Sequence, residues 1–146
     1  MLENHAMYKE EEVGLNILSF HHVGLLVERI ENSIKQYSDL FGRANVSGII
    51  TIESQKVKVC FVKISEASFI ELVEPIDQES VVYKLLKKRV NYYHVGYKVA
   101  DILSAVSRLE ELNYKALEFF NSEAFEGKRC IFLFTPGAYL IELIEQ

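Results

Sequence analysis

The phrase His-Val-Gly occurs twice in this chain of 146 residues, and its repetition constrains the fold more than any other feature. The first copy begins at His22 and the second at His94, 72 residues later (94 − 22), which is close to half the chain length. The apolar pattern behind each copy also repeats in register, as Ile30 and Ile102 illustrate. We therefore predict two copies of one module, related by a pseudo-twofold axis that brings the two histidines toward a common centre.

Composition places the chain among ordinary globular proteins. Hydrophobic residues make up 49% of it and charged residues 25%. A chain of this length forms one compact domain or two small modules with a shared core. The formal net charge of −5 argues against a nucleic-acid partner, because nucleic-acid binding usually needs a basic face. The apolar runs are far shorter than the roughly 18 residues that cross a bilayer, so no membrane partner is expected.

The first residues and the two cysteines bear on the location of the protein. Residues 1–16 are polar and are predicted to form an arm before the fold, and 1–13 lack the basic and apolar regions of a secretory signal. Cys60 and Cys130 each lie inside an apolar, strand-like run. We expect both to be buried, reduced thiols, which indicates a cytoplasmic protein.

Hydrophobic periodicity predicts the order β-α-β-β-β in each half of the chain. In the first half, a helix is expected over 30–41 and strands at 17–27, 46–52, 57–64 and 68–74. In the second half, a helix is expected over 102–112 and strands at 92–99, 115–119, 129–134 and 138–145. The predicted fold class is α+β, with two βαβββ modules forming an open, curved, eight-stranded mixed sheet around a metal site.

Individual residues mark the ends of these elements. Gly42 and Asn113 suit the C-terminal caps of the two helices, and Asp101 suits the N-terminal cap of the second. Leu40 and Leu112 are assigned to the apolar helix faces. We predict a single domain over 17–146, with modules at about 17–76 and 91–146 and a linker helix at about 79–89.

Four polar residues are the candidate functional side chains, because strand alternation directs them to one face of the sheet. Each module contributes a histidine from its first strand, His22 or His94, and a glutamate from its fourth, Glu71 or Glu142. Each glutamate lies between apolar residues of the same strand face, where an unpaired carboxylate is costly. Two imidazoles and two carboxylates suit a divalent transition metal and leave positions for water or substrate.

Two further interpretations accompany this assignment. Taken alone, each of the four residues would more often be a hydrogen-bonded core residue, and only their pairing by the repeat favours a metal. Alternation along the first strand directs His21 away from His22, and Tyr93 stands at its place in the second module. His21 is therefore predicted to be structural.

Three segments resemble the vicinal oxygen chelate superfamily, which includes glyoxalase I, extradiol dioxygenases, resistance proteins and methylmalonyl-CoA epimerase. They are Phe20–Gly24, Ile70–Pro75 and Leu140–Leu143, and they are most similar to the epimerase branch. The resemblance covers about residues 18–146. It implies a glyoxalase-like fold whose metal ligands are His22, Glu71, His94 and Glu142.

By that resemblance, the protein is a metal-dependent isomerase or epimerase that abstracts a proton α to a carbonyl. The implied substrate is an acyl-CoA such as methylmalonyl-CoA, and Glu142 would double as the acid/base beside the metal. The expected cofactor is a divalent ion, namely cobalt, nickel, manganese or zinc, and a homodimer is expected. Epimerases of this branch can use a carboxylate on the third strand as a second base, but Lys58 or Val59 stands there.

Two other functions stay open at this point. A glyoxalase I-type lactoylglutathione lyase would use the same ligand set, although only Arg29 and Arg43 are available near the first strand for glutathione. A resistance-type protein would bind a small molecule without converting it, but such members generally lack the complete ligand set.

Overall fold

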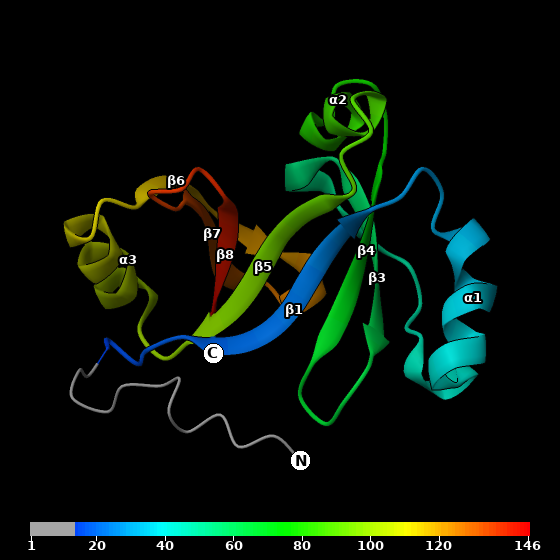
Figure 1. The fold of residues 1–146 in the computed structure, drawn as a ribbon, viewed down its shortest axis with the longest axis horizontal. Helices are drawn as coiled ribbons and strands as arrows, with labels where there is room; N and C mark the ends of the chain where they lie inside the picture. Colours follow the sequence, from blue (N-terminus) through cyan, green and yellow to red (C-terminus); the bar gives the residue numbers. More distant parts are fainter. Residues whose placement is uncertain (1–13) are drawn as a thin grey trace, which may run out of the picture.

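A computed structural model describes residues 14–146, so the arm predicted for 1–16 lies almost entirely outside the described residues. The described residues form eight strands and three α-helices (Figure 1). In chain order they are β1 (Ser19–Leu26), α1 (Glu31–Phe41), β2 (Ile50–Ile52), β3 (Val57–Lys63), β4 (Phe69–Pro75), α2 (Val81–Lys87), β5 (Tyr92–Val99), α3 (Ile102–Glu111), β6 (Lys115–Ser122), β7 (Lys128–Phe134) and β8 (Leu140–Glu145). The order β-α-β-β-β predicted for each half is confirmed.

All eight strands belong to one curled mixed sheet in the order β2-β3-β4-β1-β5-β8-β7-β6. Figure 1 shows β1 and β5 side by side along the middle of this sheet. They run antiparallel, whereas β1 pairs with β4 and β5 pairs with β8 in parallel. Val23 faces Val95 across the central pair, with His22 opposite Gly96 and Gly24 opposite His94. The two modules are therefore related by a pseudo-twofold axis at the Val23–Val95 pair.

The two long helices cover the outer face of the sheet. The helix α3 buries Ile102, Ala105 and Leu109 against Leu133 and Leu143. On the other module, residues of α1 pack on the cluster that contains Cys60, Val62 and Leu72. Because side chains alternate along a strand, Glu71 and Glu142 point to the opposite, inner face. The helices therefore stabilise the sheet without covering the side that carries the polar residues.

The predicted apolar helix faces need one correction. Leu40 and Leu112 are 65% and 50% exposed, so they do not belong to these faces. Leu40 lies one residue before Phe41, which places it about 100° away around the helix from a residue that packs on the core. Leu112 lies beyond Glu111, the last residue of α3, and is followed by Asn113, which turns the chain away from the helix.

The strand predicted at 46–52 is wrong over its first half. Arg43–Asn45 form a 3-10 turn, η2, and Val46 makes only an isolated bridge to Val62, so pairing begins at Ile50. The hydroxyl of Ser47 accepts a hydrogen bond from the backbone N–H of Phe61, at 2.8 Å. A side chain thus replaces a strand carbonyl at this point and delays the ladder.

The predicted caps are confirmed. Asp101 Oδ1 accepts a hydrogen bond from the N–H of Ser104 at 3.1 Å, which satisfies a free donor at the start of α3. Gly42 and Asn113 take φ values of +91° and +70° after their helices. Glu74 points away from the inner face, and its Oε1 accepts from the N–H of Ile30 at 2.8 Å, just before α1.

The described residues also bear on the predictions for the cysteines and for membrane spans. Cys60 and Cys130 are both buried and free, as expected. Within residues 14–146, none of the helices is long and apolar enough to cross a membrane.

Candidate metal centre

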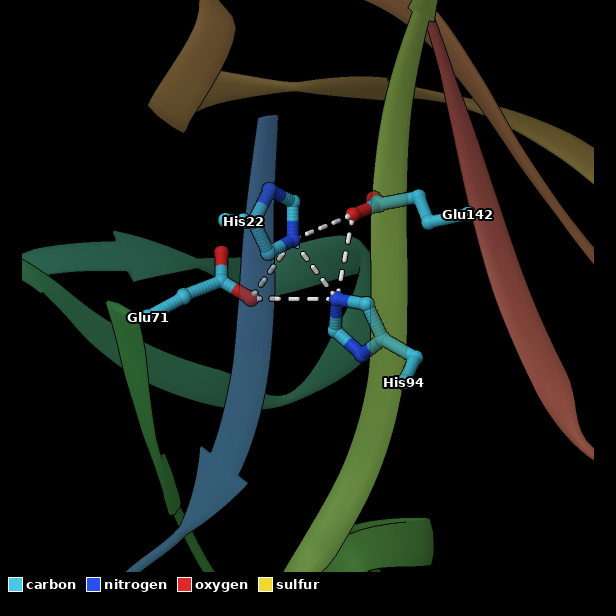
Figure 2. Close-up of side chains that lie close together, drawn as sticks. All are labelled: His22, Glu71, His94 and Glu142. Carbon is cyan, nitrogen blue, oxygen red and sulfur yellow. Dashed lines mark hydrogen bonds and ion pairs between the residues drawn. The ribbon is translucent and has the colours of Figure 1, made fainter. Parts of the chain in front are cut away.

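The four polar residues predicted from the repeat meet at one point on the inner face of the sheet (Figure 2). Nε2 of His22 lies 2.8 Å from Nε2 of His94, and each of these nitrogens lies 3.3 Å from Oε1 of Glu142. Oε1 of Glu71 approaches the same two nitrogens at 3.5 Å and 3.3 Å. Figure 2 shows the two carboxylates on opposite sides of the imidazoles. All four residues are at most 4% exposed.

The register of the central strands explains how four such groups fit together. Gly24 of β1 lies between Glu71 of β4 and His94 of β5 in one row across the sheet. The matching row places Gly96 between Glu142 and His22. A Cβ on Gly24 would lie 2.6 Å from Cε1 of His94, so the absent side chain provides the room for the ring.

These two glycines are functional residues that sequence reasoning missed. Both were visible as the third residue of the repeated His-Val-Gly phrase. Their role depends on the register between β1 and β5, because each glycine accommodates the histidine of the other module.

Burial and opposite charge act against each other at this cluster. Burial alone would raise the pKa of Glu142, but the imidazoles of His22 and His94 hold that pKa well below its ordinary value. Burial likewise opposes charge on His94, but Glu142 and Glu71 raise the pKa of His94 to about 9. The metal-free cluster is therefore an ion pair in which His94 carries a proton and Glu142 is ionised.

The donor set fits a divalent metal. Two donor atoms about 2.1 Å from one cation and at right angles to each other lie about 3 Å apart. The N–N and N–O separations of 2.8–3.5 Å match this spacing. Glu142 Oε1 is buried and has no hydrogen-bond partner within the described part of the chain. A cation would satisfy this oxygen and compensate the two buried carboxylates.

His21 departs from its prediction. Nδ1 of His21 lies 2.9 Å from Nδ1 of His22, so the side chain does not point to the opposite face. The register against β5 shifts here, because Phe20 pairs with Tyr97 but His22 with Gly96. β1 thus contains a β-bulge at His21, and a bulge redirects a side chain that strict alternation would send the other way. Burial is the main reason that the pKa of His21 falls to about 4, so its ring is neutral at pH 7.

The position on the third strand that faces the site is Val59. It is buried and lines the same small cavity as Glu71 and Glu142, whereas Lys58 pairs with Glu74. This cavity of about 20 Å³ is otherwise lined mainly by apolar residues, with Tyr93 beside His94. Burial, followed by the two carboxylates, raises the pKa of Tyr93, so its phenol stays neutral.

Two 3-10 turns from opposite modules meet beside the site. They are η3 (Glu53–Gln55), between β2 and β3, and η4 (Glu123–Phe125), between β6 and β7. The N–H of Glu53 donates to Oε2 of Glu123 at 3.1 Å, which joins the two turns. Gln55 lines the cavity, and the ring of Phe125 stacks near His22. The two modules therefore contact each other beside the site as well as forming it.

A curled sheet of two βαβββ modules, with two histidines and two glutamates buried on its inner face, defines a glyoxalase-like fold with a candidate metal centre. The family model described as the Glyoxalase/Bleomycin resistance protein/Dioxygenase superfamily matches residues 21–134. The chain therefore belongs to this superfamily, and the predicted resemblance is confirmed.

The chain is also similar to particular proteins, in sequence and in structure. The chain is 26% identical over 128 residues to "Uncharacterized protein YqjC" of Bacillus subtilis, covering 85% of this chain and 89% of that protein. It is 30% identical over 99 residues to the "Ethylmalonyl-CoA/methylmalonyl-CoA epimerase" of Cereibacter sphaeroides, covering 66% of this chain and 72% of the relative. Among solved structures, methylmalonyl-CoA epimerase from Mycobacterium tuberculosis is similar with a TM-score of 0.75 and 23% identity, covering 92% of this chain and 93% of that one. This structural likeness shows the fold.

Proposed function

We propose that the protein is a metal-dependent isomerase that moves a proton on the carbon next to a thioester carbonyl of an acyl-CoA. The observation that carries the proposal is the convergence of His22, Glu71, His94 and Glu142, whose ligand atoms lie within 4.8 Å of one another. We assign these four residues as the metal ligands. A divalent cation held there supplies positive charge that stabilises the negative charge on a carbonyl oxygen as the α proton leaves.

Glu142 is the residue that we assign to the proton transfer. Its carboxylate is ionised in the metal-free cluster, because the two imidazoles keep its pKa low. A carboxylate beside the reacting carbon takes up the α proton and returns it. The apolar wall that includes Val59 and Phe132 limits the water at the site, which strengthens electrostatic interactions there.

The names of two similar proteins support an acyl-CoA substrate. The Cereibacter relative is an ethylmalonyl-CoA/methylmalonyl-CoA epimerase, and the Mycobacterium neighbour is a methylmalonyl-CoA epimerase. We therefore propose methylmalonyl-CoA as the first substrate to test, in a homodimeric, cytoplasmic enzyme as the sequence predicts.

Epimerisation needs a proton removed from one face of the carbon and returned to the other. Glu71 and Glu142 are the carboxylates among the residues that line the cavity, and they lie on opposite sides of the imidazoles. An epimerase built on this site would therefore use both, because Val59 cannot serve as a base. The same valine favours a second candidate, a glyoxalase-type isomerase of a hemithioacetal, in which one carboxylate can move the proton between neighbouring carbons.

A thioester needs more space than the cavity offers. A cavity of about 20 Å³ has room for roughly one water molecule. The contact between Glu53 and Glu123 joins the two turns beside the site, and we propose that it opens when a thioester binds. The described residues that line the cavity include neither lysine nor arginine to pair with the CoA phosphates, so these would bind outside it.

Two measurements on one preparation test the proposal. Elemental analysis and reconstitution with Co²⁺, Ni²⁺, Mn²⁺ or Zn²⁺ should identify one bound ion per chain. Turnover is then measured in parallel with methylmalonyl-CoA and with methylglyoxal plus glutathione, and solvent deuterium uptake at the α carbon is followed. We expect uptake with the thioester and its loss on chelation.

The variant Glu142→Gln distinguishes the proposed chemistry from simple ligand binding. The amide oxygen can still contact a metal but cannot carry the proton, so at saturating metal the turnover should fall on the order of 10²–10⁴-fold. Full activity of this variant would remove Glu142 from the mechanism. Turnover of the hemithioacetal alone would select the glyoxalase-type reaction. A metal-free protein that binds a small molecule unchanged would refute an enzymatic role.

A further inference from the structure

We propose that His21 is a positioning residue for the metal centre: it accepts a hydrogen bond from Nδ1 of His22 and so holds the His22 ring with its Nε2 directed at the metal. This inference rests on the proposed function, because it requires His22 to be a ligand. It concerns a residue outside the ligand set, which alternation along β1 had directed to the other face.

With a metal bound to Nε2 of His22, the geometry allows one arrangement of the proton between His21 and His22. Nδ1 of His21 and Nδ1 of His22 are 2.9 Å apart, which is a hydrogen-bond distance, so one of them carries a proton and the other accepts it. Nε2 of His22 faces the three other ligands and must offer its lone pair to a cation. The proton of a neutral His22 therefore resides on Nδ1, and His21 is the acceptor. Acceptors of this kind fix the tautomer and orientation of metal-binding histidines.

The surroundings of His21 hold it in this role. Its ring packs against Phe69, Phe125 and Phe61, with centroids 4.8, 5.5 and 6.1 Å away. The residue is only 9% exposed. An imidazole enclosed by three phenylalanine rings keeps one orientation, so its Nδ1 stays aimed at His22.

The second module lacks an equivalent of this hydrogen bond. Nδ1 of His94 is buried without a hydrogen-bond partner within residues 14–146. Tyr93 occupies the place of His21, and its ring lies 4.8 Å from that of His94, edge to face. The ring of His94 is held instead by packing on Gly24 and Phe132. The register between β1 and β5 shifts at Tyr93 as it does at His21, so the side chain at this place, and not the bulge, decides that one ligand and not its twin has a hydrogen-bonded support.

Two substitutions of His21 distinguish its role as a hydrogen-bond acceptor from its role in packing. His21→Asn retains an acceptor, because its Oδ1 is as far along the side chain as Nδ1 of histidine, but it loses much of the ring contact. His21→Phe retains an aromatic ring but has no acceptor. We expect His21→Phe to bind Zn²⁺ about 10- to 100-fold more weakly than the unaltered protein. We expect His21→Asn to recover most of that affinity, although its metal-free form melts at a lower temperature.

Zn²⁺ affinity is measured by calorimetry on the full chain, and thermal unfolding of the metal-free variants is measured alongside. Phe69→Leu serves as the packing control, because it loosens the packing around His21 and leaves the Nδ1 atoms of His21 and His22 in place. Its Zn²⁺ affinity should stay within about threefold of that of the unaltered protein, which is less than the loss expected when the hydrogen-bond acceptor is removed. Equal affinities for His21→Phe and the unaltered protein would overturn the inference. So would equal losses in His21→Asn and His21→Phe, which would assign His21 to packing.

A spectroscopic measurement gives an independent readout. In the Zn²⁺-loaded protein, ¹⁵N spectra of the imidazoles should show a protonated Nδ1 on His22 and an unprotonated Nδ1 on His21. The reverse assignment would overturn the inference while leaving the metal centre intact. Failure of the unaltered protein to bind any of Co²⁺, Ni²⁺, Mn²⁺ and Zn²⁺ would instead refute the proposed function, and the inference with it.

Discussion

The imidazole of His22 lies over Gly96 of the opposite module, where an added Cβ would come within 2.5 Å of its Nδ1. The same relationship holds in reverse between His94 and Gly24. Each module therefore provides a ligand and also the space in which the other module's ligand lies. The repeated His-Val-Gly phrase encodes both functions with one antiparallel pairing of β1 and β5.

This contact predicts the effect of a single methyl group. Gly96→Ala should displace the His22 ring, because the added Cβ would lie too close to three atoms of that ring. We expect a loss of about 1–3 kcal/mol in the free energy of unfolding, as for other overpacked cores, and weaker binding of Zn²⁺. Gly48→Ala is the matched control, since a Cβ there meets nothing within 4 Å. Denaturant unfolding and calorimetry check both variants, and a Gly96→Ala protein that binds Zn²⁺ normally would contradict the reasoning.

Neighbouring carboxylates on β4 offer a second matched pair. Glu71 faces His22 and His94, whereas Glu74 faces outward and accepts a hydrogen bond from Ile30. Glu71→Gln should weaken Zn²⁺ binding at least about 10-fold, because a neutral amide is a poorer ligand than a carboxylate. Glu74→Gln keeps an acceptor oxygen for Ile30 and should bind Zn²⁺ like the unaltered protein. Similar affinities for the two variants would exclude Glu71 from the ligand set.

Metal binding should strengthen as the pH rises. The pKa of His94 is raised to about 9 in the metal-free cluster, so below that pH a metal must displace a proton from this ring. The pKa of Glu142 is lowered, so its carboxylate is already ionised at neutral pH and does not contribute to the pH dependence of metal affinity. Apparent affinity should therefore fall about 10-fold per pH unit from pH 9 toward pH 7, with about one proton released per ion. Calorimetry in buffers of different ionisation enthalpy measures this release, and a flat pH profile would contradict it.

A prediction at a distance from the site concerns the start of α3. Asp101→Ala removes the side-chain acceptor of the Ser104 N–H and should lower the free energy of unfolding by about 1 kcal/mol. Asp101→Asn keeps an acceptor and should lose much less. Neither variant should alter Zn²⁺ affinity, because α3 packs on the outer face of the sheet. Urea unfolding of both variants measures the difference, and an equal loss in the two would show that the cap does not depend on the acceptor.

Much of the architecture was predictable because the repeat and the strand alternation can be recognised in the sequence without knowing which strands pair. The order of elements follows from apolar periodicity, and the four residues of the metal centre follow from their equivalent places in the two modules. Assigning these residues as ligands stays a proposal, as do the domain boundaries and the homodimer.

The features that escaped prediction depend on contacts between strands. Strict alternation in the sequence predicts that His21 points away from His22. Only the register shift against β5 reveals the bulge that turns His21 toward His22. The delayed start of β2 results from a hydrogen bond between Ser47 and Phe61, which lie 14 residues apart. The choice between Lys58 and Val59 likewise required the pairing of β3 with β4.

The reciprocal arrangement of histidine and glycine has an evolutionary consequence. One βαβββ unit alone carries half of the ligands and none of the space that they need, so an unduplicated ancestor could have formed this centre only by pairing with an identical copy. Joining two copies in one polypeptide let each position mutate separately. His21 and Tyr93 differ at equivalent places, and this difference breaks the symmetry where a chiral reaction would benefit from unequal surroundings.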